Sequence, residues 1–433
     1  MGRLKIRLKG DKIIWIIVLC LAIISLLAVF SSSTFLANKA GVSKFFILRE
    51  QLISVSIGFA ALLICYMIPM RFYRFLAFPV FGITIVMLVL LFIIPDTRNE
   101  AARGIRLFGR TIQVFEFAKV GLILYIAKAL EYWENSLTTY KDFLLKILLP
   151  IAVVCMMVMV NSFSSALFFG VISILLLFFM NVNGKHLGIT VGIGILVLAL
   201  LFGTYLLFYK DKNYAEGEEP ALVGKFFNRF ETATNRIVNF VEAKKEVDKD
   251  AEATMTEAER LREQDSKRQA ENAKIAIHEG GIFGKGPGKS TQRYSLSMAF
   301  SDFIYAFIVE EYGLVGGIFV ILLYLIFLFR CITIANRCET IFPAALVLGL
   351  AFLIATQAFL HILVNVGLMP VTGHTLPLIS HGGTAYMVLS GAFGILLSIS
   401  KQLDKQDEIK HKELEEEAKQ KEDEIMYSEN YLL

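Results

Sequence analysis

The sequence predicts an all-α polytopic membrane protein with about ten transmembrane helices and a large external loop after the seventh. Composition gives the first two observations behind this prediction. Hydrophobic residues make up 56% of the 433 residues and charged residues only 19%, and the mean hydropathy is +0.61. A soluble domain is about 45–50% apolar and about 25% charged, so the excess apolar surface is expected to face lipid. The third observation is a series of long uncharged runs, each long enough to cross a membrane.

The uncharged runs place the individual helices, because a spanning helix needs about 20 mostly apolar residues. The run 147–184 is too long for one helix and is expected to form two, folded at the polar string 161–165. A further helix is expected at 114–130, although Glu116 and Lys119 fall inside it. The other seven spans are expected at 13–30, 52–69, 75–95, 187–209, 312–329, 341–370 and 382–400.

The charged residues orient the chain in a cell (inner) membrane and divide it into five parts. Lys and Arg dominate residues 1–12, so this arm is expected in the cytoplasm, and ten spans place both termini there. Much of the external loop is rich in Ala, Glu, Lys and Arg, which predicts a long surface helix over 241–277. The parts are the basic cytoplasmic arm 1–12, helices one to seven at 13–209, the external loop 210–298, helices eight to ten at 299–400, and the charged cytoplasmic tail 401–433, expected as a solvated helix or a disordered extension.

One short loop departs from this charge rule. Residues 96–113 fall outside in the predicted topology and yet hold Arg98, Arg103, Arg106 and Arg110. The loop either binds an anion or is a tolerated exception. The net charge of +4 gives no reason to expect a nucleic-acid partner, and neither the five cysteines nor the six histidines have a spacing that predicts disulfides or a structural metal.

Ionisable residues at membrane depth are costly and are therefore candidates for function. Asp302, Glu310 and Glu311 open the eighth span. On a helix, Asp302 and Glu310 would share nearly one face, and the aromatic residues that flank Asp302 would exclude water from it. Such an environment suits a general base. The alternative is a carboxylate that only pairs with an arginine of a loop.

Two turns rich in glycine and proline are expected to border one external cavity, because irregular backbone at membrane depth must line a cavity or be buried in protein. The first, 280–290, lacks the leading glycine and the preceding strand of a nucleotide-binding loop. It is either a turn whose amides and lysines face a ligand phosphate or a plain flexible turn. The second is 369–384. His361 and Asn365 of the ninth span are more typical of hydrogen bonds between helices than of ligands.

Three motifs carry a resemblance to a known family. They are AKIAIHEGGIFGKGPG at 273–288, SDFIYAFIVEEYG at 301–313 and LPLISHGGT at 376–384. With these motifs and ten predicted spans, residues 13–400 resemble the SEDS family, named for shape, elongation, division and sporulation. The motifs are more similar to the division-type members than to the elongation-type members.

The resemblance implies an activity and its partners. It implies an inverting peptidoglycan glycosyltransferase that polymerises lipid II during cell division and works with a class B penicillin-binding protein and other membrane proteins of the division machinery. The chemistry needs a base for the acceptor hydroxyl and cations for the leaving pyrophosphate. No carboxylate cluster near Asp302 requires a metal ion. No cofactor is assigned with certainty, and a divalent cation stays an open alternative.

The resemblance also implies roles for individual residues. The catalytic aspartate of the family matches Asp302. The expected substrate-binding residues are Arg103, Glu116, Lys119, Arg236, Ser380, Gly382 and Gly383. The chain departs from the family pattern at Gly104, Ser162 and His381, where the family has Trp, Asp and Tyr.

Three alternatives to a division polymerase stay open at this point. An elongation-type polymerase would differ only in its partner. A lipid II flippase would need charged residues along the whole path, but the charged residues expected inside spans are only Glu116, Lys119, Glu310 and Glu311, which favours a site open on one side. The third alternative is a non-catalytic activator of a transpeptidase.

Overall fold

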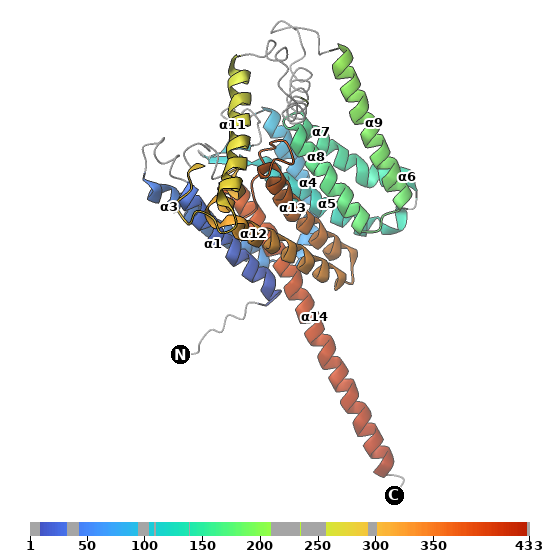
Figure 1. Cartoon of the computed structure of the whole chain (residues 1–433). Helices are drawn as coiled ribbons and strands as arrows, with labels where there is room; N and C mark the ends of the chain where they lie inside the picture. Colours follow the sequence, from blue (N-terminus) through green and yellow to red (C-terminus); the bar gives the residue numbers. More distant parts are fainter. Residues whose placement is uncertain are drawn as a thin grey trace.

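The computed structural model describes residues 9–32, 43–93, 104–107, 110–137, 139–208, 234, 257–292 and 301–430. Their regular structure is helical apart from one short hairpin (Figure 1). Within these residues, eight helical segments are long and apolar enough to cross a membrane. Two further apolar helices are α5 (Val114–Tyr132), which carries several charges, and α8 (Phe163–Phe179), which is slightly shorter. The predicted all-α polytopic membrane fold is confirmed.

Most helices overlap the predicted runs. In chain order the remaining elements are α1 (Lys12–Ser32), α3 (Lys44–Met67), α4 (Met70–Ile93), α6 (Tyr140–Phe143), a π-helical turn (Leu144–Leu148), α7 (Leu149–Met159), α9 (Gly184–Phe208), α11 (Glu257–Gly280), α12 (Ile304–Asn336), α13 (Ile341–Asn365) and α14 (Gly383–Asn430). Helix α6 lies before the run 147–184, and α3 begins eight residues before the run 52–69. The expected surface helix of the long loop is present as α11, and the part of that prediction at 241–256 lies outside the described residues.

The predicted fold within 147–184 is confirmed. Helix α7 ends at Met159 and α8 begins at Phe163. Ser162 is the N-cap of α8: its Oγ accepts a hydrogen bond from the backbone N of Ser165 at 3.4 Å. Serine is a favourable N-cap because its hydroxyl satisfies a backbone N–H that the first turn leaves free. Ser162, where the chain departs from the family pattern, therefore caps the start of α8.

The loop before α5 contains an antiparallel hairpin that the sequence did not predict. Strands β1 (Gly104–Leu107) and β2 (Arg110–Gln113) pair in the register Gly104 to Gln113 and Ile105 to Ile112. A Cβ on Gly104 would lie 2.7 Å from the carbonyl oxygen of Ile112, so the close approach of the two strands requires glycine here.

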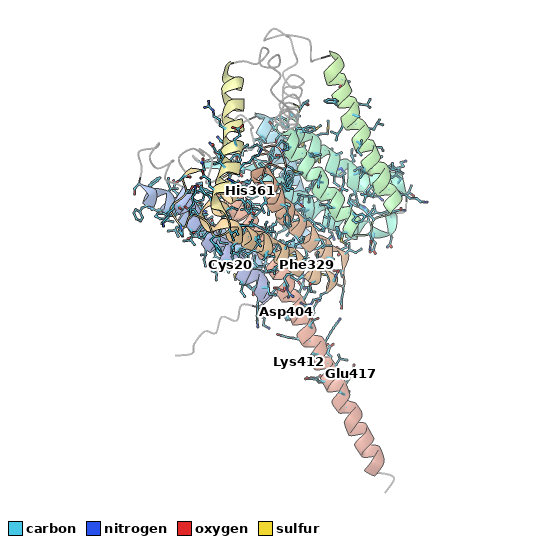
Figure 2. The ribbon with its side chains drawn as sticks, viewed as in Figure 1. Cys20, Phe329, His361, Asp404, Lys412 and Glu417 are labelled. Atoms are coloured by element: carbon cyan, nitrogen blue, oxygen red, sulfur yellow. The ribbon has the colours of Figure 1, made fainter. Side chains whose placement is uncertain are left out.

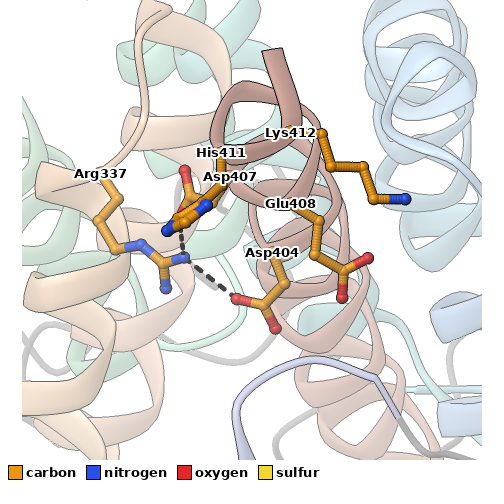
Figure 3. Close-up of a pocket in the computed structure, with 6 residues that line it drawn as sticks. All are labelled: Arg337, Asp404, Asp407, Glu408, His411 and Lys412. Carbon is orange, nitrogen blue, oxygen red and sulfur yellow. Dashed lines mark hydrogen bonds and ion pairs between the residues drawn. The ribbon is translucent and has the colours of Figure 1, made fainter. Parts of the chain in front are cut away.

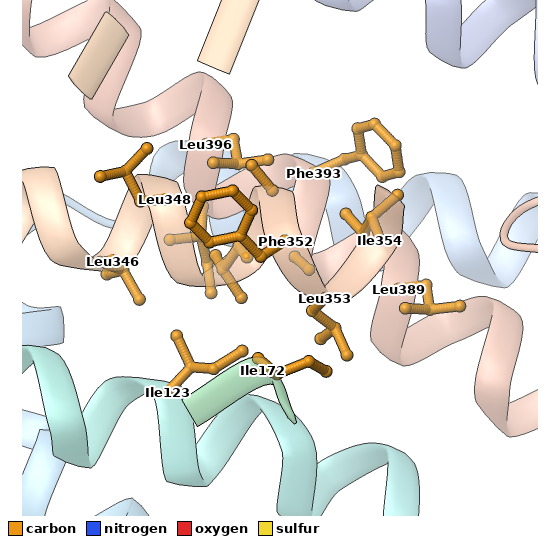
Figure 4. Close-up of a cluster of buried hydrophobic side chains, with 14 of the residues drawn as sticks. Ile123, Ile172, Leu346, Leu348, Phe352, Leu353, Ile354, Leu389, Phe393 and Leu396 are labelled. Atoms are coloured by element: carbon orange, nitrogen blue, oxygen red, sulfur yellow. The ribbon is translucent and has the colours of Figure 1, made fainter. Parts of the chain in front are cut away.

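Helix α13 lies in the interior of the bundle together with the first part of α14. In their most apolar stretches 78% and 83% of the residues are buried, against 12% in α9. Figure 4 shows Leu353 of α13 near Ile123 of α5 and Ile172 of α8, with Leu389 and Phe393 of α14 on the other side. Because α13 is enclosed by other helices rather than by lipid, polar side chains on it must find partners inside the protein.

The two ends of the bundle differ. Residues 9–12 and the extension of α14 lie at one end, which we call the termini end (Figure 1). There Asp11 accepts a hydrogen bond from Arg330 Nε at 3.0 Å, and Lys9 lies 3.0 Å from Glu408. Helix α11 lies at the opposite end, which we call the α11 end. Of the two expectations for the tail, a helix or a disordered extension, the structure has the helix, because α14 continues without a break to Asn430.

Candidate functional site

Asp302 lies in a turn at the α11 end, directly before α12. The prediction that it belongs to the eighth helix is wrong, because α12 begins at Ile304 and residues 301–303 form a turn. The expected shared helical face with Glu310 is therefore wrong as well. The carboxylate is half-buried, and its Oδ1 accepts a hydrogen bond from Ser301 Oγ at 2.9 Å. The aspartate is thus reachable from the surface and already oriented.

The turn 301–303 is anchored from two neighbouring segments. Ser380, in the second proline- and glycine-rich turn, donates from Oγ to the carbonyl oxygen of Ser301 at 2.8 Å. The same Oγ accepts from the backbone N of Leu376 at 2.8 Å, which holds that turn closed. Asn365, at the end of α13, donates from Nδ2 to the carbonyl oxygen of Asp302 at 3.1 Å. The structure therefore brings Ser380 and Asp302, both predicted site residues, into one hydrogen-bonded unit.

Glu116 and Lys119 form a second, deeper cluster on α5. Their side chains pair at 2.7 Å with Lys119 only 3% exposed, and Lys119 also donates to Oε1 of Gln357 at 2.7 Å. The ammonium lies 5.4 Å from the centre of the Phe168 ring. An ammonium so enclosed needs both the carboxylate and the amide oxygen to replace its lost water.

One face of α13 joins the two clusters. Gln357, His361 and Asn365 are spaced four residues apart, so they lie in a row along the helix. Gln357 Nε2 donates to the carbonyl oxygen of Thr375 at 3.0 Å, and His361 Nδ1 lies 2.8 Å from that of His374. The eight residues from Gln357 to Asn365 rise on the order of 12 Å along the helix. Lys119 binds Gln357 and the Asp302 carbonyl binds Asn365, so Lys119 lies about that far below the backbone of Asp302. His361, labelled in Figure 2, is buried in the bundle.

Gly382 and Gly383 connect the second turn to α14. The carbonyl oxygen of Gly382 accepts the backbone N–H of Tyr386 at 2.7 Å, and Gly383 is the first residue of the helix. The next residue, Thr384, accepts from the backbone N of Gln113 at 3.1 Å, just before α5. The pair of glycines thus lies where the turn, the β-hairpin and the start of α5 meet.

His381 has a defined partner in place of the family tyrosine. Its Nδ1 lies 2.6 Å from Oε1 of Gln51 on α3, whose Nε2 donates to Ser25 Oγ of α1 at 2.8 Å. Ser25 in turn donates to the carbonyl oxygen of Ile379 at 2.8 Å. This relay ties the second turn to α1 and α3. Burial lowers the pKa of His381, which favours its neutral form.

The first glycine-rich turn is bound to the start of α12. Its backbone amides bind the carboxylates of α12: Gly288 N donates to Glu311 and Thr291 N to Glu310, at 2.9 and 2.7 Å. Lys285 lies 2.9 Å from Glu310, whose side chain is fully buried. The turn is therefore docked on α12 through carboxylates of the protein itself, and of the two expectations the plain flexible turn is wrong.

The structure does not place two of the predicted site residues, and it shows one polar residue that was not predicted. Arg103 and Arg236, both expected to bind substrate, lie outside the described residues. Sequence reasoning missed Gln357, although its spacing with His361 and Asn365 was a readable signal of a polar helix face. Among the described residues, no group of three or more His, Cys, Asp or Glu side chains is placed to hold a metal ion.

The fold and this site define a class: polytopic α-helical membrane proteins with an anchored aspartate at one end of the bundle. A family model described as cell cycle protein, covering FtsW, RodA and SpoVE, matches residues 11–405. The chain belongs to this family, and the resemblance to SEDS proteins drawn from its motifs is confirmed.

Curated relatives agree with this assignment, and solved structures share the fold. The chain is 31% identical over 386 residues to a probable peptidoglycan glycosyltransferase FtsW of Bacillus subtilis, covering 87% of this chain and 86% of the relative. It is 27% identical to a protein of the same name from Geobacter metallireducens, covering 90% and 95%. Two solved structures, each 20% identical, share the fold over 90% of this chain and 97% of theirs: a peptidoglycan synthase complex at TM-score 0.65 and Thermus thermophilus RodA at 0.59.

Proposed function

We propose that this protein is a peptidoglycan glycosyltransferase of the division type that polymerises lipid II, with Asp302 as the general base. Relatives named as peptidoglycan glycosyltransferases over nearly their full length support the activity. The observation that carries the assignment of the base is the placement of Asp302. It is a half-buried carboxylate at one end of the bundle, in a turn held by Ser380 and Asn365.

The reaction can be written as one displacement. The acceptor sugar hydroxyl gives its proton to Oδ2 of Asp302 while its oxygen forms a bond to the anomeric carbon of the donor. The bond between that carbon and the pyrophosphate oxygen breaks, and the polyprenyl pyrophosphate leaves with the electron pair. One displacement inverts the anomeric configuration. Ser301 supports the base by donating to Oδ1, which leaves Oδ2 to take the proton of the acceptor.

Cations are needed where the pyrophosphate charge develops. Arg103, Arg236 and Lys119 are the proposed cations, and Glu116, Gly382 and Gly383 the other proposed substrate contacts. Lys119 lies deep in the bundle and is already paired with Glu116, so its contact with the substrate would be made from below the turn. No cofactor is assigned, and running the polymerisation assay with and without magnesium tests whether a divalent cation is needed.

The orientation follows from the basic residues of the termini end. Lys9, Lys12, Arg330 and Arg337 all lie there, so we propose that this end faces the cytoplasm and that Asp302 faces the outside of the inner membrane. Both termini are then cytoplasmic. The proposed partners are a class B penicillin-binding protein and other membrane proteins of the division machinery.

The test is polymerisation of labelled lipid II by the purified full chain with its cognate class B penicillin-binding protein. Asp302→Asn removes the base and keeps the shape. Ser398→Ala is the matched control, because Ser398 loses only a 2.7 Å hydrogen bond to the carbonyl of Ile68, away from Asp302. We expect glycan strands from wild type and control and none from Asp302→Asn.

Three outcomes would redirect the proposal. Equal product from Asp302→Asn and wild type would remove Asp302 as the base. An intact complex with no product from any variant, with or without magnesium, would favour a flippase or an activator. Activity only with the elongation-type penicillin-binding protein would favour an elongation role over division.

A further inference from the structure

The first turn of α12 lacks a cap of its own. Phe303 occupies the N-cap position and makes no side-chain hydrogen bond there. The first N–H groups of a helix have no partner inside the helix, and burial makes each unpaired one costly. Ala306, in this first turn, is fully buried. Its N–H therefore needs an acceptor from elsewhere in the fold.

Asn365 of α13 supplies that acceptor. Its Oδ1 accepts from the backbone N of Ala306 at 3.0 Å, and the asparagine is itself fully buried. Its Nδ2 donates to two carbonyl oxygens, that of Asp302 at 3.1 Å and that of His361 at 2.8 Å. A reversed carboxamide would face one N–H with its NH2 group and two carbonyls with its oxygen, so the observed orientation is the one that satisfies all three partners.

The backbone of Asp302 is thus held on both sides. Asn365 binds the carbonyl of Asp302 itself, and Ser380 binds the carbonyl of Ser301 at 2.8 Å. The two anchors come from different segments, the end of α13 and the second proline- and glycine-rich turn. With both peptide groups fixed, the Cα–Cβ direction of Asp302 is fixed. The hydrogen bond from the Ser301 hydroxyl then orients the carboxylate.

We propose that Asn365 is the positioning residue for Asp302: one buried carboxamide caps α12 from a neighbouring helix and fixes the turn that carries the base. Asn365 does not touch substrate and acts only through Asp302. This inference rests on the proposed function. A base displaced by about 1 Å can cost on the order of 100-fold in rate, whereas substrate binding that does not involve the base is unchanged.

The test separates kcat from KM for lipid II in the purified complex with the class B penicillin-binding protein. For Asn365→Ala we expect kcat to fall about 10- to 100-fold with KM within about twofold of wild type. The matched control is again Ser398→Ala, which removes one side-chain hydrogen bond to the backbone of another helix and should keep both constants. Complex formation and thermal unfolding are followed in parallel.

A second variant covers the case in which Asn365→Ala does not fold. Asn365→Asp keeps an oxygen for Ala306 N–H, and so the helix cap, but replaces the donor to the carbonyls of Asp302 and His361 with an oxygen that repels both. Its thermal unfolding is measured first, and the folded variant should lose at least about tenfold in kcat. Wild-type kcat in either folded variant, or a raised KM at unchanged kcat, would overturn the inference. An active Asp302→Asn variant would show that Asp302 is not the base. An inactive Asp302→Asn variant together with fully active Asn365 variants would contradict only the positioning role of Asn365.

Discussion

The ammonium of Lys285 lies 2.9 Å from the carboxylate of Glu310, which is fully buried in α12. The two residues are 25 positions apart, one in the glycine-rich turn after α11 and one in the helix beneath it. Glu310 also accepts from Thr291 N at 2.7 Å and Gln292 N at 3.2 Å. This carboxylate is therefore one point at which the turn after α11 is bound to the bundle, beside the bond from Gly288 N to Glu311.

The first prediction is that neutralising Glu310 releases the turn. In Glu310→Gln an NH2 group would replace one acceptor oxygen among several donors, at a cost on the order of 2–3 kcal/mol. Hydrogen exchange of the amides of 285–292 should become faster while α13 keeps its protection. Lys289→Met, at an exposed lysine of the same turn, is the control and should leave exchange unchanged. Unchanged exchange in Glu310→Gln would contradict this role.

The second prediction concerns the close approach of the turn to α12 at Gly313, where non-helical backbone angles kink the helix. Gly284 and Gly313 have φ values of +77° and +72°, and a Cβ on either would collide with a backbone carbonyl of the opposite segment. Alanine at either position should lower the free energy of unfolding by roughly 2–4 kcal/mol. Gly170→Ala in α8, where a Cβ meets open space, is the control. Equal thermal stability of all three variants would contradict the prediction, because it would mean that the backbone shifts to make room for the added Cβ.

The third prediction separates two roles of Lys119. Lys119→Met leaves Glu116 buried without its partner and should cost about 3–5 kcal/mol. Adding Glu116→Gln removes the uncompensated charge, so the double variant should regain part of that stability. If Lys119 also binds the pyrophosphate, the double variant regains stability and not activity. Recovery of both would make the pair purely structural. Thermal unfolding and lipid II polymerisation of the same samples decide this.

The fourth prediction is a pH window for the docked turn. The hydrogen bond from Lys285, and then that from Thr291, hold the pKa of Glu279 below its usual value. Burial lowers the pKa of Lys285, but the bonds to Glu279 and Glu310 outweigh it and the net pKa is raised. The Glu279 contribution is lost as pH falls through its folded pKa, and the Lys285 contribution as pH rises through its folded pKa.

The turn should therefore be held most firmly between those two values and loosen at both extremes. Exchange of the 285–292 amides, corrected for the intrinsic effect of pH, measures this. Glu279→Gln should flatten the acid side of the profile and keep the alkaline side. A profile that is the same with and without Glu279 would contradict the prediction.

The fifth prediction is that the ion pairs at the base of the α14 extension contribute little. Arg337 lies 3.1 Å from Asp404 and 2.6 Å from Asp407, beside a recess of about 550 Å³ (Figure 3). Its side chain is 36% exposed, so water and salt screen these pairs. Arg337→Ala should change the free energy of unfolding by less than about 1 kcal/mol, and less still in high salt. A larger loss would show that the extension is part of the folded core.

The sequence predicted the helices well because the requirement behind them is local. A run of about 20 apolar residues must be helical in lipid whatever its neighbours are, and a polar string such as 161–165 marks the break between two helices. The family was also readable locally, since its motifs are continuous strings. The start of α12 was misplaced because aromatic residues on both sides of Asp302 suit a helix and a buried turn equally well.

Partners across the bundle could not be read in the same way. Apolarity and spacing predict that Lys285, Glu310, Lys119 and Asn365 need partners, but they do not say which. Packing of the helices decided that Lys285 meets Glu310, that Lys119 meets Gln357, and that Asn365 meets the turn of Asp302. The sequence by itself determined the membrane fold, the family and the candidate base. Only the tertiary structure decided how that base is held, because hydrogen bonds between distant segments depend on distances that no local pattern contains.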